Sequence, residues 1–312
     1  MCFSAQEWAD YRKYVRKFGA DIGIREFVEL YCRRKDGQKV KIPKGMDLAF
    51  SDATTPEGRE IWAMVEEWNS REVTKLEQEM FKQAKRLADA ERTLQTKTTK
   101  KALDDQRIAG NKVAQIKGKL ADLKRTDAKD RDSRIFPMVY GTVMVWEDGR
   151  LVVKPMRYGC RLNGKPLRYD DDFSGTYNAR RDSLEKYWQP LFGRKHALMV
   201  VETFYENVER EGGRNEVLQF TPKDGSLMYI ACLWDHWQGK GKDAGEPDLL
   251  SFAAITDDPE PEVAAAGHDR TIINIKPEHV EAWLNPDPNN LAALHAIFDD
   301  RQHPYYEHRL AA

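Results

Sequence analysis

The stretch MVYGTVMVWEDGRLVVK, residues 138–154, decides which fold this sequence favours. It contains two runs that are rich in β-branched and aromatic residues. Between them, Glu147-Asp-Gly-Arg150 has the composition of a tight turn. Residues 138–146 and 151–154 are therefore predicted to form an antiparallel β-hairpin.

More apolar runs of strand length follow this hairpin. Strands are predicted over residues 197–204, 216–221, 227–233, 250–255 and 271–275, and helices over residues 182–188, 277–284 and 290–298. The two element types do not alternate regularly, as they would in a parallel βαβ sheet. The sequence therefore predicts an α+β fold with a mainly antiparallel, barrel-like sheet and flanking helices.

The start of the chain has a helical texture. Aromatic residues such as Trp8 and Tyr11 recur at helical spacing, which predicts helix over residues 5–33 with a second run over residues 24–31. Residues 40–55 are punctuated by Pro and Gly and are predicted to be loop.

The composition then shifts to Lys, Glu, Gln and Ala over residues 57–128. A polar break at residues 95–99 separates two apolar seams, which consist of Val73, Met80, Leu87 and Leu94 before it and Val113, Ile116, Leu120 and Leu123 after it. Heptad spacing on both sides predicts two helices folded into an antiparallel coiled-coil hairpin. A single long helix and a disordered charged linker are the alternatives.

This hairpin defines the predicted domain organisation. Residues 1–56 and 132–312 are expected to form one catalytic domain, and residues 57–131 an inserted helical hairpin. The hairpin can bury its own seam, so we expect it to be dispensable for the chemistry.

The charge of the whole chain does not indicate a nucleic-acid partner. Lys and Arg total 50 against 51 Asp and Glu, a net charge of −1. Residues 150–195, however, hold eleven basic and five acidic residues with interleaved aromatics. Arginines can hold phosphates and aromatics can stack on bases, although an ordinary solvated surface has the same composition.

Cysteine use and hydropathy predict the compartment. The four cysteines are Cys2, Cys32, Cys160 and Cys232, and their spacing is not that of a metal site. Neither an N-terminal apolar segment nor a long membrane-spanning run is present. We therefore expect a soluble, cytoplasmic protein with no membrane partner, no metal and no cofactor.

Cys2 has chemistry that an internal cysteine lacks. Removal of Met1 would leave Cys2 with both an α-amine and a thiol, whose ordinary pKa values are about 7.7–8.0 and about 8.5. The amine can condense with an aldehyde to an imine, and the thiolate can then close a five-membered thiazolidine ring. The thiolate alone could instead act as an ordinary nucleophile.

Three polar residues could assist Cys2. Asn178 precedes a predicted helix, Glu206 ends an apolar strand, and His268 precedes another strand. A carboxyl and an imidazole can together donate and accept protons. A turn asparagine, a strand-end carboxylate and a surface histidine are the alternative interpretations.

Several short segments, taken in order, carry a resemblance to a known family. They are Met1-Cys2, residues 155–159, 178–180, 204–206, 231–234, 255–256, 268–270 and 281–284. This ordered set resembles the SRAP family (SOS-response-associated peptidase), the abasic-site-processing proteins. The resemblance covers Cys2 and roughly residues 135–286.

The resemblance implies a protein that captures abasic sites in single-stranded DNA through a thiazolidine crosslink at Cys2. It implies proton transfer by Glu206 and His268, and positioning of Cys2 by Asn178. The DNA-binding residues that it implies are Arg157, Arg180, Thr256 and Arg270.

Two other classes of function remain open from the sequence. Cys2, Glu206 and His268 could form a cysteine peptidase or an N-terminal-nucleophile hydrolase. Alternatively, the chain could be an interaction protein that binds a protein partner through its coiled coil.

Overall fold

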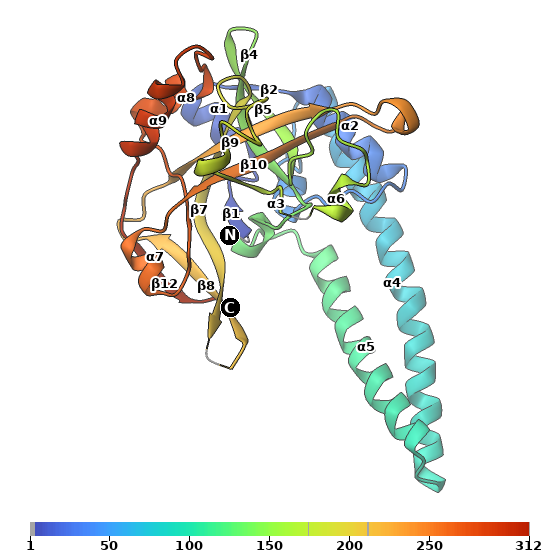
Figure 1. The fold of residues 1–312 in the computed structure, drawn as a ribbon. Coiled ribbons are helices and arrows are strands. Elements are labelled where there is room, and N and C mark those ends of the chain that lie inside the picture. The colour runs from blue at the N-terminus through green and yellow to red at the C-terminus, as the bar shows by residue number, and fades with distance from the viewer. Residues whose placement is uncertain (1–3, 174, 211, 312) are drawn as a thin grey trace.

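A computed structural model of the chain describes residues 4–173, 175–210 and 212–311. A strand-rich body carries a long helical hairpin that projects from one side (Figure 1). The predicted α+β class, with its mainly antiparallel sheet and its helical hairpin, is confirmed.

Five strands of a twelve-stranded sheet pair in a closed ring. In ring order they are β4 (Tyr140–Glu147), β5 (Arg150–Tyr158), β10 (Leu249–Asp257), β9 (Met228–Trp237) and β7 (His196–Arg210), which pairs again with β4. Only the β5–β10 pair of this ring is parallel. Successive residues such as Val143 and Met144 belong to separate buried clusters, so these strands are covered on both faces.

The β4–β5 hairpin forms as predicted from the sequence. Its turn residues Asp148 and Gly149 both have positive φ, 50° and 79°, as a two-residue turn between twisted strands requires. Glu147 pairs with Arg150 across this turn.

The remaining strands of the sheet extend the ring. They are β1 (Ser4–Glu7), β2 (Asp21–Ile22), β3 (Arg134–Ile135), β6 (Asn178–Arg180), β8 (Arg214–Pro222), β11 (Thr271–Ile272) and β12 (Tyr306–Leu310). Strand β1 lies between β3 and β7, so the start of the described chain is part of the sheet.

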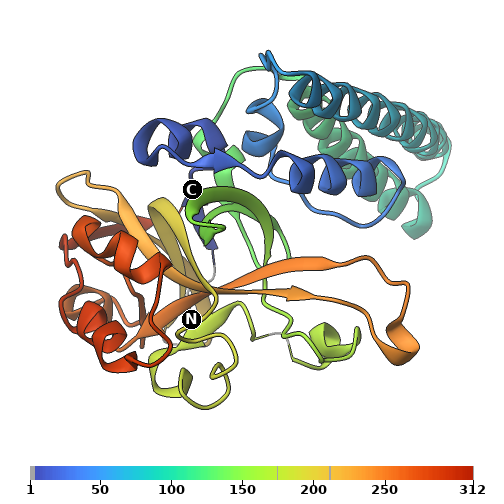
Figure 2. The same ribbon diagram turned by 90° about the horizontal axis from the view of Figure 1, so that it is seen from above.

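Small helices cover the body. They are α1 (Tyr11–Phe18), α2 (Ile24–Lys35), α3 (Lys44–Leu48), α6 (Tyr169–Asp172), α7 (Pro261–Ala265), α8 (Val280–Leu284) and α9 (Leu291–Asp299). The red C-terminal helices α8 and α9 lie on the opposite side of the body from the blue-green hairpin (Figure 2). Trp283 of α8 donates a hydrogen bond of 2.9 Å to the backbone of Ala197, which fixes α8 on β7.

Four local predictions are wrong. Residues 5–7 form strand β1 instead of helix, because Ala5 and Glu7 are buried where β1 pairs with β7. The predicted loop 40–55 contains α3. Residues 182–188 form a short 3₁₀ turn followed by further turns. The strand predicted over residues 271–275 ends at Ile272.

The projecting hairpin consists of α4 (Pro56–Thr96) and α5 (Lys100–Lys124), which run antiparallel (Figure 1). Thr55 and Thr99 cap the two helix starts, each accepting a backbone N–H bond of 3.1 Å. The buried seam consists of Gln83, Ala90, Ala102, Ala109, Ile116 and Leu120.

The base of α4 packs on the body. Ile61, Met64 and Val65 share a buried cluster with Phe27 of α2 and with Phe50. The domain boundaries at residues 56/57 and 131/132 stay a prediction. In the described part of the chain, no helix has the length and apolar character needed to cross a membrane.

Candidate active site

A buried carboxylate and an imidazole lie together at the end of the ring. Glu206 is fully buried on β7, and His268, which is 8% exposed, lies in the segment between α7 and β11. The distance between His268 Nε2 and Glu206 Oε2 is 3.4 Å. Two residues that the sequence places 62 positions apart are therefore neighbours in space.

The backbone of Arg270 contacts Nδ1 of His268 through both its carbonyl oxygen and its N–H. The Nδ1 atom lies 2.8 Å from the Arg270 carbonyl oxygen, so we assign the Nδ1 proton to that hydrogen bond. Nε2 then faces Glu206 with its lone pair. At 3.4 Å, the Glu206 carboxyl and the His268 ring are close enough to pass a proton from one to the other.

Burial decides the charge of His268. Loss of solvent lowers the pKa of His268 below its ordinary value, against the hydrogen bond to the Arg270 carbonyl, which raises it. His268 is therefore neutral at neutral pH and can accept a proton.

Asn178 lies on strand β6, at one margin of the sheet. Strand β6 pairs in parallel with β10, with Asn178 beside Ala254. The Tyr158 hydroxyl donates a hydrogen bond of 3.1 Å to Asn178 Oδ1, and the Tyr158 ring stacks on Phe252. Tyr158 falls in the segment 155–159 that carried the family resemblance, but the sequence did not indicate this role.

The start of the described chain lies beside this site. Ser4 of β1 pairs with Tyr205, the residue before Glu206. Arg134 donates a hydrogen bond of 3.0 Å to Ser4 Oγ, and its guanidinium lies 3.5 Å from the centroid of the Tyr205 ring. The sequence does not indicate a role for Arg134, because nothing in the local pattern separates it from other surface arginines. Cys2 lies outside the described residues.

Three of the four predicted DNA-binding residues surround one hollow. Arg180, Thr256 and Arg270 line a cavity of about 260 Å³. Strand pairing brings them together, since Thr256 of β10 pairs with Arg180 on one side and with Ile272 on the other.

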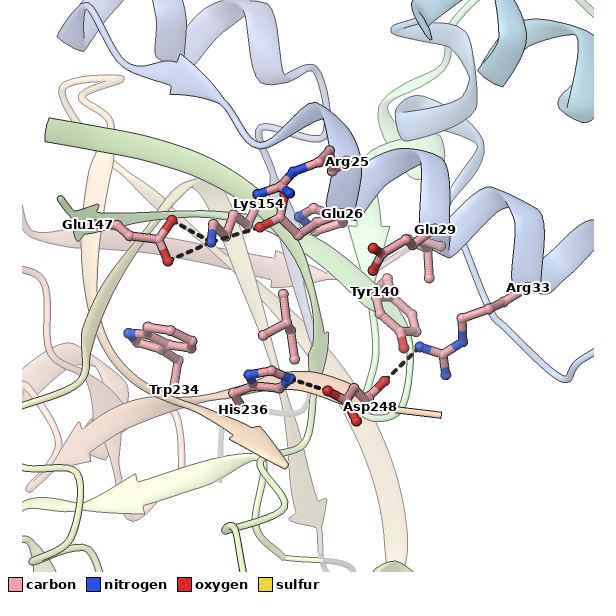
Figure 3. Close-up of a pocket in the computed structure, with 13 residues that line it drawn as sticks. Arg25, Glu26, Glu29, Arg33, Tyr140, Glu147, Lys154, Trp234, His236 and Asp248 are labelled. Carbon is pink, nitrogen blue, oxygen red and sulfur yellow. Dashed lines mark hydrogen bonds and ion pairs between the residues drawn. The ribbon is translucent and has the colours of Figure 1, made fainter. Parts of the chain in front are cut away.

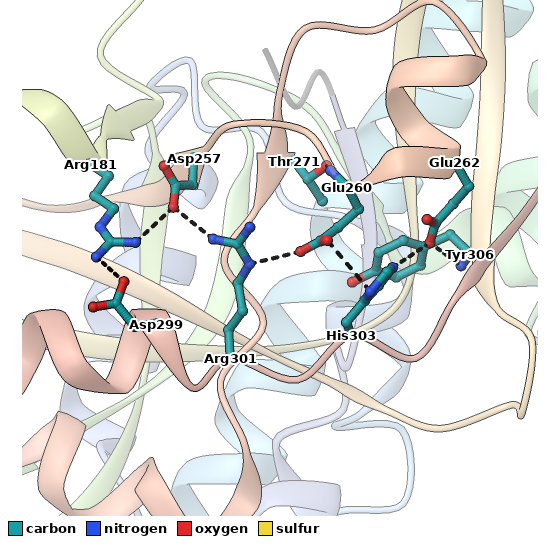
Figure 4. Close-up of polar contacts among 9 residues, drawn as sticks. All are labelled: Arg181, Asp257, Glu260, Glu262, Thr271, Asp299, Arg301, His303 and Tyr306. Carbon is teal, nitrogen blue, oxygen red and sulfur yellow. Dashed lines mark hydrogen bonds and ion pairs between the residues drawn. The ribbon is translucent and has the colours of Figure 1, made fainter.

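A chain of ion pairs braces the end of β10 beside this hollow (Figure 4). Asp257 binds Arg181 at 3.0 Å and Arg301 at 2.7 Å, and Arg301 also binds Glu260 at 2.7 Å. These contacts fix the residue after Thr256 and the residue after Arg180, and so restrict the geometry of the hollow.

Arg157 is separate from that hollow. It is 8% exposed, its guanidinium binds Asp170 at 2.6 Å, and it also donates to the Gly159 carbonyl. Arg161 binds the same Asp170 carboxylate. Burial opposes ionisation of Asp170, but hydrogen bonds from Arg161 and Arg157 prevail and lower its pKa. The structure gives Arg157 a bracing contact, and its contact with DNA stays a prediction.

Replacing Asp170 by Asn is expected to destabilise the protein by about 3–5 kcal/mol, because two buried guanidiniums lose their shared countercharge. Urea unfolding followed by circular dichroism measures the change. Asp172→Asn is the matched control: its carboxylate is 56% exposed and lies 3.8 Å from Arg168, so it should change the stability by less than about 1 kcal/mol. Equal changes in the two variants would contradict the bracing role of Asp170.

A second hollow of about 390 Å³ lies between α2 and the ring (Figure 3). Its walls include Trp234, His236 and Tyr140. Lys154 at its edge is buried, and its ammonium binds Glu26 at 2.8 Å and Glu147 at 2.6 Å. The sequence does not indicate this hollow, because its lining comes from five separate elements, α2, β4, β5, β9 and β10. Across residues 4–173, 175–210 and 212–311, no group of three His, Cys, Asp or Glu side chains is arranged to hold a metal ion.

Comparison with known proteins places these residues in a family context. The sequence profile described as "SOS response associated peptidase (SRAP)" matches residues 91–309. No curated protein matches the chain.

Several solved structures are similar to the chain at low sequence identity. A Bordetella bronchiseptica protein is 18% identical over 58% of this chain and 87% of its own, with a TM-score of 0.46. A Bacteroides thetaiotaomicron protein is 16% identical over 57% and 77%, with a TM-score of 0.45. A phage-related protein from Bordetella bronchiseptica is 17% identical over 57% and 80%, with a TM-score of 0.41.

Proposed function

We propose, from the premise that this chain belongs to the SOS response associated peptidase (SRAP) family, that it captures abasic sites in single-stranded DNA as a covalent thiazolidine on Cys2. The single observation that carries the proposal is the buried Glu206–His268 pair, with 3.4 Å between Oε2 and Nε2. Strand β1 enters the sheet beside this pair, and Cys2 is two residues upstream of Ser4.

Each step of this reaction needs a proton to be moved. The α-amine of Cys2 attacks the aldehyde carbon of the open abasic sugar, water leaves, and an imine forms. The thiolate sulfur then bonds to the imine carbon while the nitrogen takes up a proton. A carboxyl and an imidazole at this distance can relay the protons that open the sugar ring and protonate the departing hydroxyl. We assign these transfers to Glu206 and His268.

Positioning is assigned to two other groups. Asn178, held by Tyr158, would orient the N-terminal nucleophile. Arg180, Thr256 and Arg270 would bind the DNA around the reacting sugar, the two arginines through phosphate oxygens.

A peptidase activity is the second candidate, and the description of the family favours it. Removal of Met1 would be one such cleavage. Turnover of a peptide library by the chain, without adduct formation on abasic DNA, would support this candidate over the first.

The intact mass of the protein tests the proposed function. The purified chain should lack Met1, and incubation with an abasic oligonucleotide should add the mass of the oligonucleotide less one water. A mass that stays unchanged after incubation would reject the proposal.

Removing the distal part of the hairpin should leave the chemistry intact. Residues 81–116 would be replaced by a short Gly/Ser loop, which keeps the base of α4 and its contacts with the body. Lys124 of α5 lies 3.4 Å from Glu77 of α4, so the two helices are already side by side where the loop would join them. We expect an adduct rate at saturating abasic DNA within about twofold of the parent, measured by gel electrophoresis. A folded deletion protein without adduct formation would place the distal hairpin in the reaction itself.

A further inference from the structure

The distal half of the hairpin carries an unusual charge. Residues 82–119 contain eleven basic and four acidic residues, a net charge of +7, whereas the whole chain has a net charge of −1. The remainder of the chain therefore carries −8. A basic element on an otherwise acidic protein creates a local field for anions.

Most acidic residues of this segment form ion pairs with arginines of the same segment. Asp105 binds Arg86 with 3.0 Å to its Nε, Asp89 lies 3.3 Å from Arg92, and Asp104 lies 3.8 Å from Arg107. Eight lysines of the segment are exposed and make no ion pair with any residue that the structure describes; they are Lys82, Lys85, Lys97, Lys100, Lys101, Lys112, Lys117 and Lys119.

Some of these lysines share one face of the hairpin. Lys101, Lys112 and Lys119 are separated by eleven and seven residues, close to three and two helical turns, so they form a row along α5. Lys82, Lys85 and Lys101 line a hollow of about 460 Å³ between the two helices. The row of three spans about 27 Å at 1.5 Å per residue.

The hairpin that carries this row projects from the body (Figure 1). Helix α4 has 41 residues, so it is about 60 Å long, and its seam with α5 is closed by buried residues such as Ala109 and Ile116. The lysines therefore face solvent without a partner from the ring.

A nucleic-acid backbone fits this surface better than a protein does. Phosphates recur regularly along a strand, and lysine is a flexible point charge that contacts them without reading sequence. Protein interfaces instead have an apolar core and are poor in lysine. The large apolar side chains exposed near this end of the hairpin are Phe81 and Leu103, too few for such a core.

We propose that the distal hairpin is an arm that binds the phosphate backbone of DNA adjoining the candidate active site. The lysine row would extend along about eight base pairs at a rise of 3.4 Å per pair. This inference rests on the proposed function only in its choice of DNA as the polyanion.

Salt-dependent binding of a lesion-free DNA duplex to the full chain tests the arm. The variant K101Q/K112Q/K119Q keeps good helix formers in α5 and removes three charges. We expect the slope of log Kobs against log salt to flatten by about 2.7, and the affinity near 0.1 M salt to fall by at least about tenfold. Fluorescence anisotropy measures both, and circular dichroism confirms that the variant is folded.

The matched control removes the same charge elsewhere. Lys223, Lys240 and Lys242 are exposed and make no ion pair within the described residues, so K223Q/K240Q/K242Q should change the slope by less than half as much. Equal losses of duplex affinity in the two variants, or no loss in the hairpin variant, would contradict the proposal that the hairpin binds DNA. Binding of polyglutamate or of anionic vesicles without duplex binding would overturn it in favour of an acidic protein or a membrane.

This test separates the arm from the chemistry at Cys2. Lesion-free DNA offers no aldehyde, so Cys2→Ala should bind the duplex as the parent does. A chain that forms no abasic adduct but shows the lysine effect supports the arm and rejects the proposed function. A chain that forms the adduct, but whose duplex binding is unaffected by the lysine substitutions, supports the proposed function and rejects the arm.

Discussion

Replacing Cys2 by alanine is expected to abolish the heat-stable adduct with abasic single-stranded DNA. The variant keeps an α-amine after Met1 removal, so it can still form an imine, but it has no thiolate to close the ring. An imine hydrolyses readily, whereas a thiazolidine holds the former aldehyde carbon through both nitrogen and sulfur. Denaturing electrophoresis after heating should show no shifted band for the variant, and borohydride should trap its imine.

The internal cysteines supply the control for this experiment. Burial raises the pKa of the Cys160 thiol to about 12 and raises that of Cys232 further, so both remain protonated near neutral pH. Cys32 is half-buried, and its thiol lies 3.6 Å from the sulfur of Met64. None of the three has an adjacent α-amine, so Cys32→Ser should form the adduct at the parental rate. An undiminished heat-stable adduct from Cys2→Ala would falsify the thiazolidine proposal.

The strands were the most predictable part of the fold, for a local reason. The β4–β5 hairpin depends on the two apolar runs and on Asp148-Gly149, whose left-handed backbone is what that turn requires. Strand β1 had no such local signal. Its nearby aromatics recur at helical spacing, but Ser4 pairs with Tyr205, about 200 residues away in the chain. A tertiary partner at that distance overrides a short periodic pattern.

The candidate site could be predicted only as a set of residue types. The order of the short motifs along the chain singled out Glu206 and His268. It does not show that β7 and the segment before β11 bring these two residues within 3.4 Å of each other. The family resemblance also grouped Arg157 with Arg180 and Arg270 as residues that contact DNA. Asp170, brought close by α6, instead buries Arg157 in a shared ion pair. Tyr158 and Arg134 act through contacts that the sequence does not encode locally.

Glu206→Gln and His268→Ala should each slow adduct formation at saturating DNA by about 10²–10⁴-fold, the usual contribution of a general acid–base group. Gln keeps the size of the buried side chain but cannot exchange a proton with His268. Rapid-quench sampling gives the rate at each DNA concentration, and anisotropy gives the affinity separately. Glu209→Gln is the control on the same strand, because Glu209 is exposed and should leave the rate unchanged.

The pH dependence of the adduct-formation rate gives a second test of His268 as the proton acceptor. The pKa of His268 is lowered in the folded protein by burial, so the neutral, proton-accepting form persists below its ordinary value of about 6.5. The parental rate should therefore fall on the acid side only below about pH 6.5, and His268→Ala should lose that limb. Protonation of a buried histidine also opposes folding as pH drops below its unfolded pKa, so the variants are compared first near pH 7.5. If both variants bound DNA more weakly but reached the parental rate at saturation, the pair would belong to binding, and the proton transfers would have to be assigned to other groups.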